Sequence, residues 1–595
     1  MSPAGLLQPL DVPFDPFFRV GLDLLGSFPA SVSGNKWIAV ATDYTTRPTK
    51  SIVFFMLFAT SQGLPAEKAS KPPHIIFILA DDLGWNDVSF HGSRQIPTPN
   101  IDALAATGII LQRHYTPTVC TPSRASLFTS IYPARSGVGY GVLVPAAKAA
   151  VPLKYELLPQ WFKRLGYSTH MVGKWHLGYR SMEHTPTWRG FDTFFGYYNG
   201  EMAYYNHTVT GSVTDLRGTY STQAFTDEAK HIIANHNVEE PLFLYLSYQA
   251  VHSTCEDTKP EAPQETVDKY SYITNYNRSV FAGALHVLDH SVGEVLSALQ
   301  SRDMLADSVV VFTSDNGGGP MDASLSVPNT GNNWPLRGSK GDMWEGGMRV
   351  PAVLWYGRLN SCRPRRPSQQ LMHIVDWGPT LYAAAGGDVS DLGDVDGRNL
   401  WEALTTFKDI GHEDVVLEIE GWKDAAAIIS GRYKLVNRSE DPCEPYLNNR
   451  VPLPEGDPPG GLDLDALMVS SDAWKAVHEA TIHSDPRFWS PPRPNWRQEA
   501  TIACSASGEP TVNFDPCEDV FVFDIFNDPC ELNNLASSQP ELRDGLLKKL
   551  ATYRLILSPR PSNAEVDERG HPQHHDCTWS PWVDVEPSPQ MACPC

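Results

Sequence analysis

The chain has 595 residues, of which 42% are hydrophobic and 19% are charged, as in ordinary globular proteins. Its length exceeds what one small core supports and favours two domains with additional ends. The formal net charge of −22 argues against nonspecific binding to nucleic acid or to anionic membranes.

Residues 1–49 form a segment distinct from the rest. Residues 16–26 and 35–44 resemble the start of a retrotransposon integrase core. Such a core needs three acidic metal ligands spread over a whole domain, and this stretch is too short to carry them. We therefore interpret residues 1–49 as a remnant without function and expect no nucleic-acid partner.

Residues 50–71 resemble a signal peptide that lies inside the chain. Arg47 and Lys50 precede the apolar run Ile52 to Ala59, and small residues follow at 61–66. The run is too short to span a bilayer, so no stable membrane span is expected. The alternative interpretation of this run is a buried strand.

Four apolar runs after residue 72 each end in polar or charged side chains. Uninterrupted apolar runs are typical of strands buried on both faces, as in a parallel sheet covered by helices. The carboxyl ends of neighbouring strands converge in such sheets and build a site there. The predicted strands are 74–80, 168–172, 241–248 and 308–314, and the predicted helices are 100–107, 157–165, 222–235 and 275–302.

The composition changes past about residue 410. Gly, Pro and Asp are frequent in 440–465 and 484–516, and 520–525 is a predicted strand. We expect a main domain over 72–410, a smaller C-terminal α+β domain over 411–560 and a loose Cys-containing tail over 561–595.

Cys120 and Arg124 combine a potential nucleophile with a fixed positive charge at the start of a short predicted helix, 123–129. Backbone N–H groups at a helix N-terminus favour an anion, and an Arg fork matches a tetrahedral oxyanion. The alternative is a buried structural cysteine before a capped helix.

Asp81, Asp82, Asp315 and Asn316 offer oxygen ligands after two different strands. A pair of aspartates in a loop is usually a solvated turn. Joined to a second acidic pair and to Cys120, however, it favours a divalent cation such as Ca²⁺. All-oxygen ligation argues against zinc, and magnesium remains an alternative. Arg124, Lys174 and Lys340 concentrate positive charge locally, as an acidic protein with an anionic substrate requires.

Several blocks of sequence carry a family resemblance. The Cys120–Arg124 motif, 80–88, 173–178 and 315–318 resemble sulfatase motifs and occur in the family's order. Residues 332–338 and 344–347 are similar to the arylsulfatase B group (N-acetylgalactosamine-4-sulfatase and its arylsulfatase I and J relatives). The resemblance extends from about Pro72 to about Leu557.

The resemblance implies an alkaline-phosphatase-like α/β fold, with a large mixed, mostly parallel sheet covered by helices and a smaller C-terminal α+β domain. It also implies that Cys120 is oxidised to formylglycine by the formylglycine-generating enzyme, and that the aldehyde hydrate is the nucleophile beside one bound Ca²⁺. The expected substrate is a sulfate ester of an amino sugar in a sulfated glycosaminoglycan, of the N-acetylgalactosamine 4-sulfate type.

The resemblance also implies a role for each site residue. Asp81, Asp82, Asp315, Asn316 and the residue at position 120 would hold the metal, and Asp315 would help to deprotonate the attacking hydroxyl. His176 would act as a base, while His252 and Lys340 would hold the sulfate and protonate the leaving oxygen. Lys174 and Arg124 would neutralise developing charge. Asn332, Asn333 and Trp334 either line the sugar pocket or serve packing alone.

Two other functions stay open at this stage. One is a phosphohydrolase on the same scaffold, which is disfavoured because such enzymes generally use Ser or Thr with zinc. The other is a catalytically silent sulfatase relative that only binds sulfated glycans.

The cysteines and sequons favour the secretory route. Ten cysteines suit an oxidising compartment, and Asn206, Asn277 and Asn437 begin glycosylation sequons. We therefore expect a lysosomal or secreted protein that passes through the endoplasmic reticulum. Cys517–Cys530 and Cys443–Cys504 are hypothetical disulfides. The stretch 137–152 lacks cysteines that the arylsulfatase B group has there, so the pocket rim is expected to differ.

Overall fold

The structure of the protein is a computed structural model. The structure describes Val20–Gly26, Trp37–Asp43 and most of residues 71–584. Within 71–584 the residues not described are 208–215, 217, 255–259, 320–329, 360–366, 407, 409, 411, 420–424, 439–455, 457, 485–490, 505–511, 516, 560–564 and 576.

The chain divides into two compact units, Met1–Lys71 and Pro72–Cys595. In the first unit, β1 (Val20–Gly26) and β2 (Trp37–Asp43) form an antiparallel pair. The signal-like run Ile52 to Ala59 lies outside the described residues.

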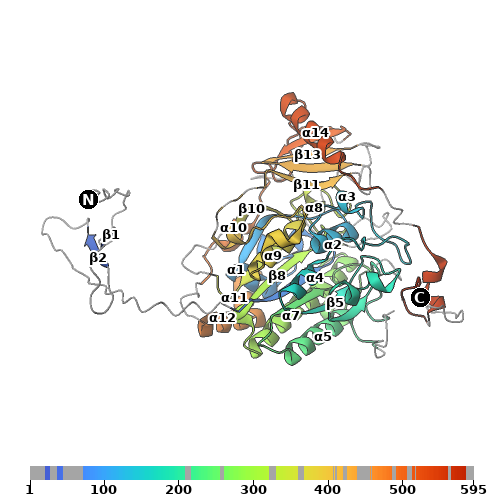
Figure 1. The fold of residues 1–595 in the computed structure, drawn as a ribbon, viewed down its shortest axis with the longest axis horizontal. Helices are drawn as coiled ribbons and strands as arrows, with labels where there is room; N and C mark the ends of the chain where they lie inside the picture. Colours follow the sequence, from blue (N-terminus) through green and yellow to red (C-terminus); the bar gives the residue numbers. More distant parts are fainter. Residues whose placement is uncertain are drawn as a thin grey trace. The chain divides into compact units, whose positions relative to one another are not determined.

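An eight-stranded mixed sheet lies at the centre of the second unit (Figure 1). Its order is β10-β4-β9-β8-β3-β7-β5-β6, and β9 runs antiparallel to β4 and β8, whereas the other pairs are parallel. This confirms the predicted large, mostly parallel sheet. The strands are β3 (His74–Ala80), β4 (Ile109–Tyr115), β5 (Ser168–Lys174), β6 (Thr193–Tyr197), β7 (Leu242–Ser247), β8 (Ser308–Ser314), β9 (Ala352–Tyr356) and β10 (Ser368–His373).

Helices cover both faces of this sheet because the central strands are apolar on both sides. Along β3, Ile76 and Ile78 join one hydrophobic cluster, while Ile75 and Phe77 join the other. The first cluster is covered by α1 (Pro99–Thr107), α5 (Ser221–Asn235), α7 (Tyr276–Ser301) and α12 (Asp472–Ser484). The second is covered by α2 (Cys120–Thr129), α4 (Leu158–Arg164), α9 (Trp377–Ala384) and α10 (Trp401–Thr406).

The register places four strand ends side by side. Ala80 of β3 pairs with Ser314 of β8, and Leu79 pairs with Ser247 of β7. Ser247 also pairs with Gly173 of β5. The residues that follow these parallel strands therefore leave the sheet at one edge.

The smaller sheet is antiparallel, in the order β11 (Asp414–Ile419), β12 (Ala426–Ser430), β13 (Tyr433–Asn437) and β14 (Val520–Asp524). One face packs against α14 (Pro540–Arg554). The opposite face packs against Trp344 and Met348, which belong to the part of the chain built around the eight-stranded sheet, here called the main unit. Figure 1 shows β11, β13 and α14 stacked above the large sheet. The Trp344 ring lies 5.0 Å from that of Phe521, so this sheet supports a loop that leads toward Lys340.

Residues 464–500 differ from the expected division of the chain. The sequence assigned them to the C-terminal domain, but α11 (Leu464–Ser470), α12 and α13 (Trp496–Ala500) pack in the core of the main unit. Their apolar side chains, among them Met468 and Val477, belong to the same hydrophobic cluster as residues of α1 and α7. The remaining helices, all short, are α3 (Pro133–Ser136), α6 (Gln264–Val267) and α8 (Glu345–Met348).

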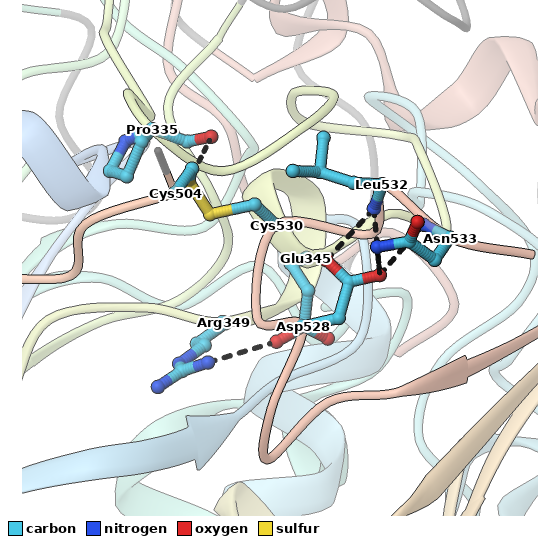
Figure 2. Close-up of a disulfide and its surroundings, with 8 residues drawn as sticks. All are labelled: Pro335, Glu345, Arg349, Cys504, Asp528, Cys530, Leu532 and Asn533. Carbon is cyan, nitrogen blue, oxygen red and sulfur yellow. Dashed lines mark hydrogen bonds and ion pairs between the residues drawn. A yellow bond between two sulfur atoms is a disulfide. The ribbon is translucent and has the colours of Figure 1, made fainter. Parts of the chain in front are cut away.

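The disulfide framework corrects both hypothetical pairs. Cys504 is bonded to Cys530, with Cα atoms 5.8 Å apart, so neither Cys517–Cys530 nor Cys443–Cys504 forms (Figure 2). Cys504 also lies 3.6 Å from the Pro335 carbonyl, through its Sγ atom. Sequence spacing could not identify the partners, because they are brought together by the packing of 464–504 on the main unit. Among the described cysteines, Cys120 is the free one.

The described part of the tail is packed rather than loose. Val566 forms a β-bridge with Ala147, and Trp582 joins Ala146 and Tyr179 in a small apolar cluster. Trp582 is 3% exposed. The sequence around Trp582 shows no helix or strand pattern, so it did not reveal this contact.

None of the helices in the described part of the chain combines the length and apolar character needed to cross a bilayer. Of the three sequon asparagines, Asn206 is exposed, whereas Asn277 and Asn437 are half-buried. Glycosylation of these residues stays a prediction.

Candidate active site

The four neighbouring strand ends deliver most of the candidate side chains to one buried place. Asp81 and Asp82 follow β3, and Asp315 and Asn316 follow β8. Lys174 ends β5, and His252 follows β7. The first residue of α2, Cys120, lies against the same edge, because its Sγ contacts Asp81 Oδ1 at 3.7 Å.

Asp81 contacts two more of the predicted site residues. Its Oδ2 accepts a hydrogen bond from Lys174 Nζ at 2.6 Å and lies 3.5 Å from Arg124 Nη2. These side chains are fully buried. Buried charges are tolerated only when they are paired in this way.

Arg124 is engaged mainly by Asp315. Its Nε and Nη2 both donate to Asp315 Oδ2, at 3.0 and 2.7 Å, and its Nη1 donates to Ser247 Oγ at 2.5 Å. A further hydrogen bond joins Nη1 to the Lys174 carbonyl. With its N–H groups directed at protein atoms, Arg124 orients Asp315 and Asp81. The resemblance implied that Arg124 neutralises developing charge and holds the diol of the aldehyde hydrate, and that role stays a prediction.

Asp82 receives the second lysine. Lys340 Nζ lies 2.7 Å from Oδ1 and 2.9 Å from Oδ2, and Asn316 Nδ2 donates to Oδ1 at 2.7 Å. Asp82 has a φ of 60°, an uncommon conformation for a residue with a side chain. Such backbone conformations cluster at functional sites.

The acidic cluster fits a hard divalent cation. One ligand atom from each of Asp81, Asp82, Cys120 and His252 lies within 4.8 Å of the others. Asn316 Oδ1 is buried and has no hydrogen-bond partner among the described residues. A buried amide oxygen without a partner is costly, and it belongs to the class of ligand that Ca²⁺ binds.

Leaving out His252, the formal charges of the carboxylates and of the Lys and Arg side chains at the site balance before any ion is added. Asp81, Asp82 and Asp315 carry three negative charges, and Arg124, Lys174 and Lys340 carry three positive ones. A divalent cation would therefore make this group of side chains positive, as an anionic substrate requires.

His252 and Lys340 are in direct contact. Nδ1 of His252 donates to the Ser253 carbonyl at 2.8 Å, so Nε2 faces Lys340 Nζ at 3.1 Å and Asp82 Oδ2 at 3.7 Å. Burial and the Lys340 cation lower the pKa of His252, but the carboxylates of Asp82 and Asp81 raise it to about 9. Nε2 lies within hydrogen-bond distance of the Lys340 ammonium group.

His176 presents the opposite tautomer. Its Nε2 lies 3.0 Å from the Leu143 carbonyl, which can only accept, so Nε2 carries the proton. Nδ1 is buried without a partner in the described structure and keeps its lone pair. Burial, reinforced by the Lys174 and Arg124 cations, lowers the pKa of His176 well below its ordinary value. His176 is therefore neutral, with a lone pair on Nδ1 that faces no donor among the described residues.

Burial and charge also shift the pKa values of the acidic groups. Burial raises the pKa of Asp81 against the Lys174 cation, and burial together with Asp81 raises that of Asp315. For Asp82, Lys340 and His252 outweigh burial and lower the pKa. Burial raises the pKa of Cys120, but Lys174 and Lys340 bring it down to about 7.

One network of contacts joins nine of the predicted residues: Asp81, Asp82, Cys120, Arg124, Lys174, His252, Asp315, Asn316 and Lys340. His176 lies close enough for the charges of Lys174 and Arg124 to lower its pKa. Asn332 and Asn333 are fully buried. Asn333 Nδ2 donates to the carbonyls of Gly318 and Gly338, and Asn332 Oδ1 accepts from Asn86 Nδ2. These contacts assign the two asparagines to packing of the loop rather than to the pocket surface.

Three further residues shape the site, and sequence reasoning did not identify them. Ser247 holds Arg124. Gly200 lies so close to His176 that a Cβ there would sit 2.7 Å from ring atom Cε1. Glu201 Oε2 lies 4.0 Å from His252 Nδ1. The sequence could have indicated Ser247, because it is a polar residue near the end of the apolar run 241–248. Gly200 and Glu201 belong to no such pattern.

The chain is similar to known proteins in sequence and in fold. A model of the sulfatase family matches residues 73–387. Arylsulfatase J of Mus musculus is 33% identical over 545 residues, covering 87% of this chain and 81% of that protein. N-acetylgalactosamine-6-sulfatase of Homo sapiens is 32% identical over 372 residues, covering 58% of this chain and 67% of that protein.

Solved structures agree on the fold. The crystal structure of Ps i-CgsB in complex with k-i-k-neocarrahexaose superposes with a TM-score of 0.63 and 23% sequence identity. The match covers 83% of this chain and 94% of that one. At this identity the similarity shows a shared architecture.

Proposed function

Because this chain belongs to the sulfatase family and is a sulfuric ester hydrolase, we propose that it cleaves sulfate esters of glycosaminoglycan amino sugars. The proposed ester is of the N-acetylgalactosamine 4-sulfate type. The observation that carries this proposal is the convergence of Cys120, three carboxylates and two lysines in one buried cluster.

Two groups complete the proposed site. Oxidation of Cys120 by the formylglycine-generating enzyme would supply an aldehyde whose hydrate offers a nucleophilic hydroxyl. A Ca²⁺ ion held by Asp81, Asp82, Asp315, Asn316 and the residue at position 120 would supply positive charge for the sulfate group. The buried, unpartnered Asn316 Oδ1 supports this ligand set.

The chain's own residues perform the remaining tasks. Asp315, oriented by Arg124, accepts the proton of the attacking hydroxyl. Lys340 and His252 hold the sulfate oxygens and deliver a proton to the leaving sugar oxygen, because they share one between Nζ and Nε2. His176 takes a proton at Nδ1 when the site is reset. General acid–base help of this kind contributes roughly 10²–10⁴-fold per group.

The proposed location is the lysosome or the cell exterior, reached through the endoplasmic reticulum. The Cys504–Cys530 disulfide and the disulfide bonding of Cys517 and Cys577 support an oxidising compartment.

Mass spectrometry of the Cys120 peptide, from protein made through a eukaryotic secretory pathway, tests the nucleophile. Sulfate release from 4-sulfated and 6-sulfated N-acetylgalactosamine oligosaccharides tests the substrate. The 6-sulfated substrate is included because one relative is named for it. An aldehyde at position 120 together with sulfate release from the 4-sulfated sugar supports the proposal. Sulfate release from the 6-sulfated sugar alone would show that the enzyme cleaves the 6-sulfate ester instead. An intact thiol without turnover would instead favour the silent, glycan-binding alternative.

A further inference from the structure

A second feature lies beside the candidate active site: a surface groove of about 700 Å³, here called the basic groove. It is lined by Ser136, Gly137, Lys148, Ala149, Ala150, Pro152, Leu153, Lys154, Arg180, His184, Ser558, Pro559 and Glu565. Nothing in the proposed reaction uses these residues.

The charge of the groove is opposite to that of the chain. Lys148, Lys154 and Arg180 contribute three positive charges, and Glu565 contributes one negative charge. The whole chain carries −22. A positive groove on so acidic a protein concentrates anions locally.

The cations are available to a ligand. Lys148 Nζ pairs with Glu565 Oε1 at 2.6 Å, but the side chains are 46% and 58% exposed, so the pair stabilises the fold little and an anion can compete for it. Lys154 is exposed, and its Nζ lies 4.8 Å from the centre of the Tyr155 ring. Within the described residues Lys154 has no carboxylate partner.

The backbone of the groove is held rigidly. Lys148 N donates to the Glu565 carbonyl at 2.8 Å, next to the bridge between Ala147 and Val566. Trp582 and Val583 both donate to the Arg180 carbonyl. The tail therefore positions the backbone that carries Lys148 and Arg180.

Apolar residues complete a surface suited to sugars. Ala149, Ala150 and Pro152 line the groove, and Leu153 is 45% exposed. Sugar rings have apolar C–H faces between their polar groups, so small apolar residues among cations match a glycan that bears sulfate or carboxylate groups.

The groove and the active site share one loop. At Leu143 the loop's carbonyl contacts His176 Nε2, and at Val151 its N–H donates to the Leu177 carbonyl. Lys148 lies between these two points. The groove and the residues around His176 are therefore connected through one loop, residues 143–151.

We propose that the basic groove is a second binding site for the substrate chain, which holds anionic groups of sugars beyond the one being desulfated. This rests on the proposed function, because it takes the ligand to be a sulfated glycosaminoglycan. A free inorganic anion would need only one or two cations, whereas this groove of about 700 Å³ presents three.

Binding is measured with the full chain carrying Cys120→Ala, so that no turnover occurs. The probes are fluorescently labelled chondroitin 4-sulfate decasaccharide and disaccharide. K148E/K154E is compared with K408E/K548E, which makes the same charge change at exposed lysines outside the groove. K148R/K154R keeps the charge.

We expect K148E/K154E to weaken decasaccharide binding about 10-fold, as loss of two exposed ion pairs implies. Binding of the disaccharide, and all binding by K408E/K548E and K148R/K154R, should change little. With Cys120 restored, K148E/K154E should raise KM for the decasaccharide and leave hydrolysis of a small aryl sulfate unchanged.

The proposal is overturned if the decasaccharide binds K148E/K154E as tightly as the parent, or if K408E/K548E weakens it equally. It is also overturned if the decasaccharide binds the parent no tighter than the disaccharide does. Because binding is scored without turnover, a parent enzyme that releases no sulfate would contradict the proposed function alone.

Discussion

Lys340 Nζ lies 3.1 Å from His252 Nε2, and both groups face the carboxylate of Asp82. The two residues are 88 positions apart in the chain and come from different loops. Neither group has its proton-transfer properties alone, because each sets the charge environment of the other.

Substitution of this pair should be strongly non-additive. Lys340→Ala and His252→Ala should each lower kcat by roughly 10²–10⁴-fold, because each removes half of a shared proton donor. The double variant should lose little more than the worse single variant, as expected for residues that act as a unit. Steady-state kinetics on one sulfated substrate for the three variants gives the coupling energy. Losses that multiply would show that the two residues act independently.

The metal prediction concerns Asn316, whose Oδ1 is buried without a partner among the described residues. Removal of bound metal by a chelator should lower the melting temperature, and added Ca²⁺ should restore it, because a ligand that binds only the folded state stabilises it. Asn316→Ala should weaken Ca²⁺ binding by about 10–100-fold or more.

Thermal unfolding against Ca²⁺ concentration measures this affinity without relying on activity. Asn199→Ala, at another buried asparagine that is not part of the cluster, is the control. Equal Ca²⁺ responses in the parent and in Asn316→Ala would remove Asn316 from the ligand set.

Gly200 should not tolerate a side chain. A Cβ at this position would lie 2.7 Å from Cε1 and 2.8 Å from Nε2 of His176, so Gly200→Ala should displace the ring and lower kcat. Gly545→Ala is the matched control, since a Cβ there meets nothing within 4 Å and Ala is the better residue inside helix α14. The control should keep full kcat and gain slightly in melting temperature. Full activity in Gly200→Ala would show that His176 is free to move.

Asp289 should make the protein more stable at acidic pH. It accepts hydrogen bonds from the Asn100 and Ile101 amides at the start of α1, and burial raises its pKa from 3.8 to about 7. The folded state therefore binds a proton more tightly than the unfolded state does. The resulting contribution to stability is complete below about pH 3.8 and is lost as the pH rises through about 7.

Asp289→Asn mimics the protonated form at every pH. The melting temperature of the variant relative to the parent should therefore rise between pH 5 and pH 8. Asp391→Asn changes an exposed carboxyl, so its melting temperature should differ from that of the parent by a constant amount over this pH range. A constant difference between Asp289→Asn and the parent would mean that Asp289 does not titrate there. Greater stability in acid would suit the proposed lysosomal location.

The sequence predicted the buried strands well because their signal is local. His74–Ala80 and Ser308–Ser314 match the predicted ranges, and unbroken apolar runs have few other uses in a chain of this composition. The strands β4, β6, β9 and β10 of the large sheet and the first three strands of the smaller sheet were not predicted. Their short lengths make helix and strand hard to separate by pattern alone.

The sequence was a poorer guide to which distant residues contact one another than to which residues form strands or helices. The Cys504–Cys530 bond and the packing of α12 on α7 both depend on residues distant in the chain, and both differ from what the sequence suggested. The number of possible cysteine pairings grows too fast for spacing to select one.

By itself, the sequence determined which chemical groups the protein has and which strands deliver them, because side-chain type and apolar runs are local properties. Only the tertiary structure decided that Arg124 is engaged by Asp315, that Lys340 meets His252 and that Asn316 keeps an oxygen without a partner. These relationships depend on strand order and on loops that converge from distant positions, and no short window of sequence contains that information.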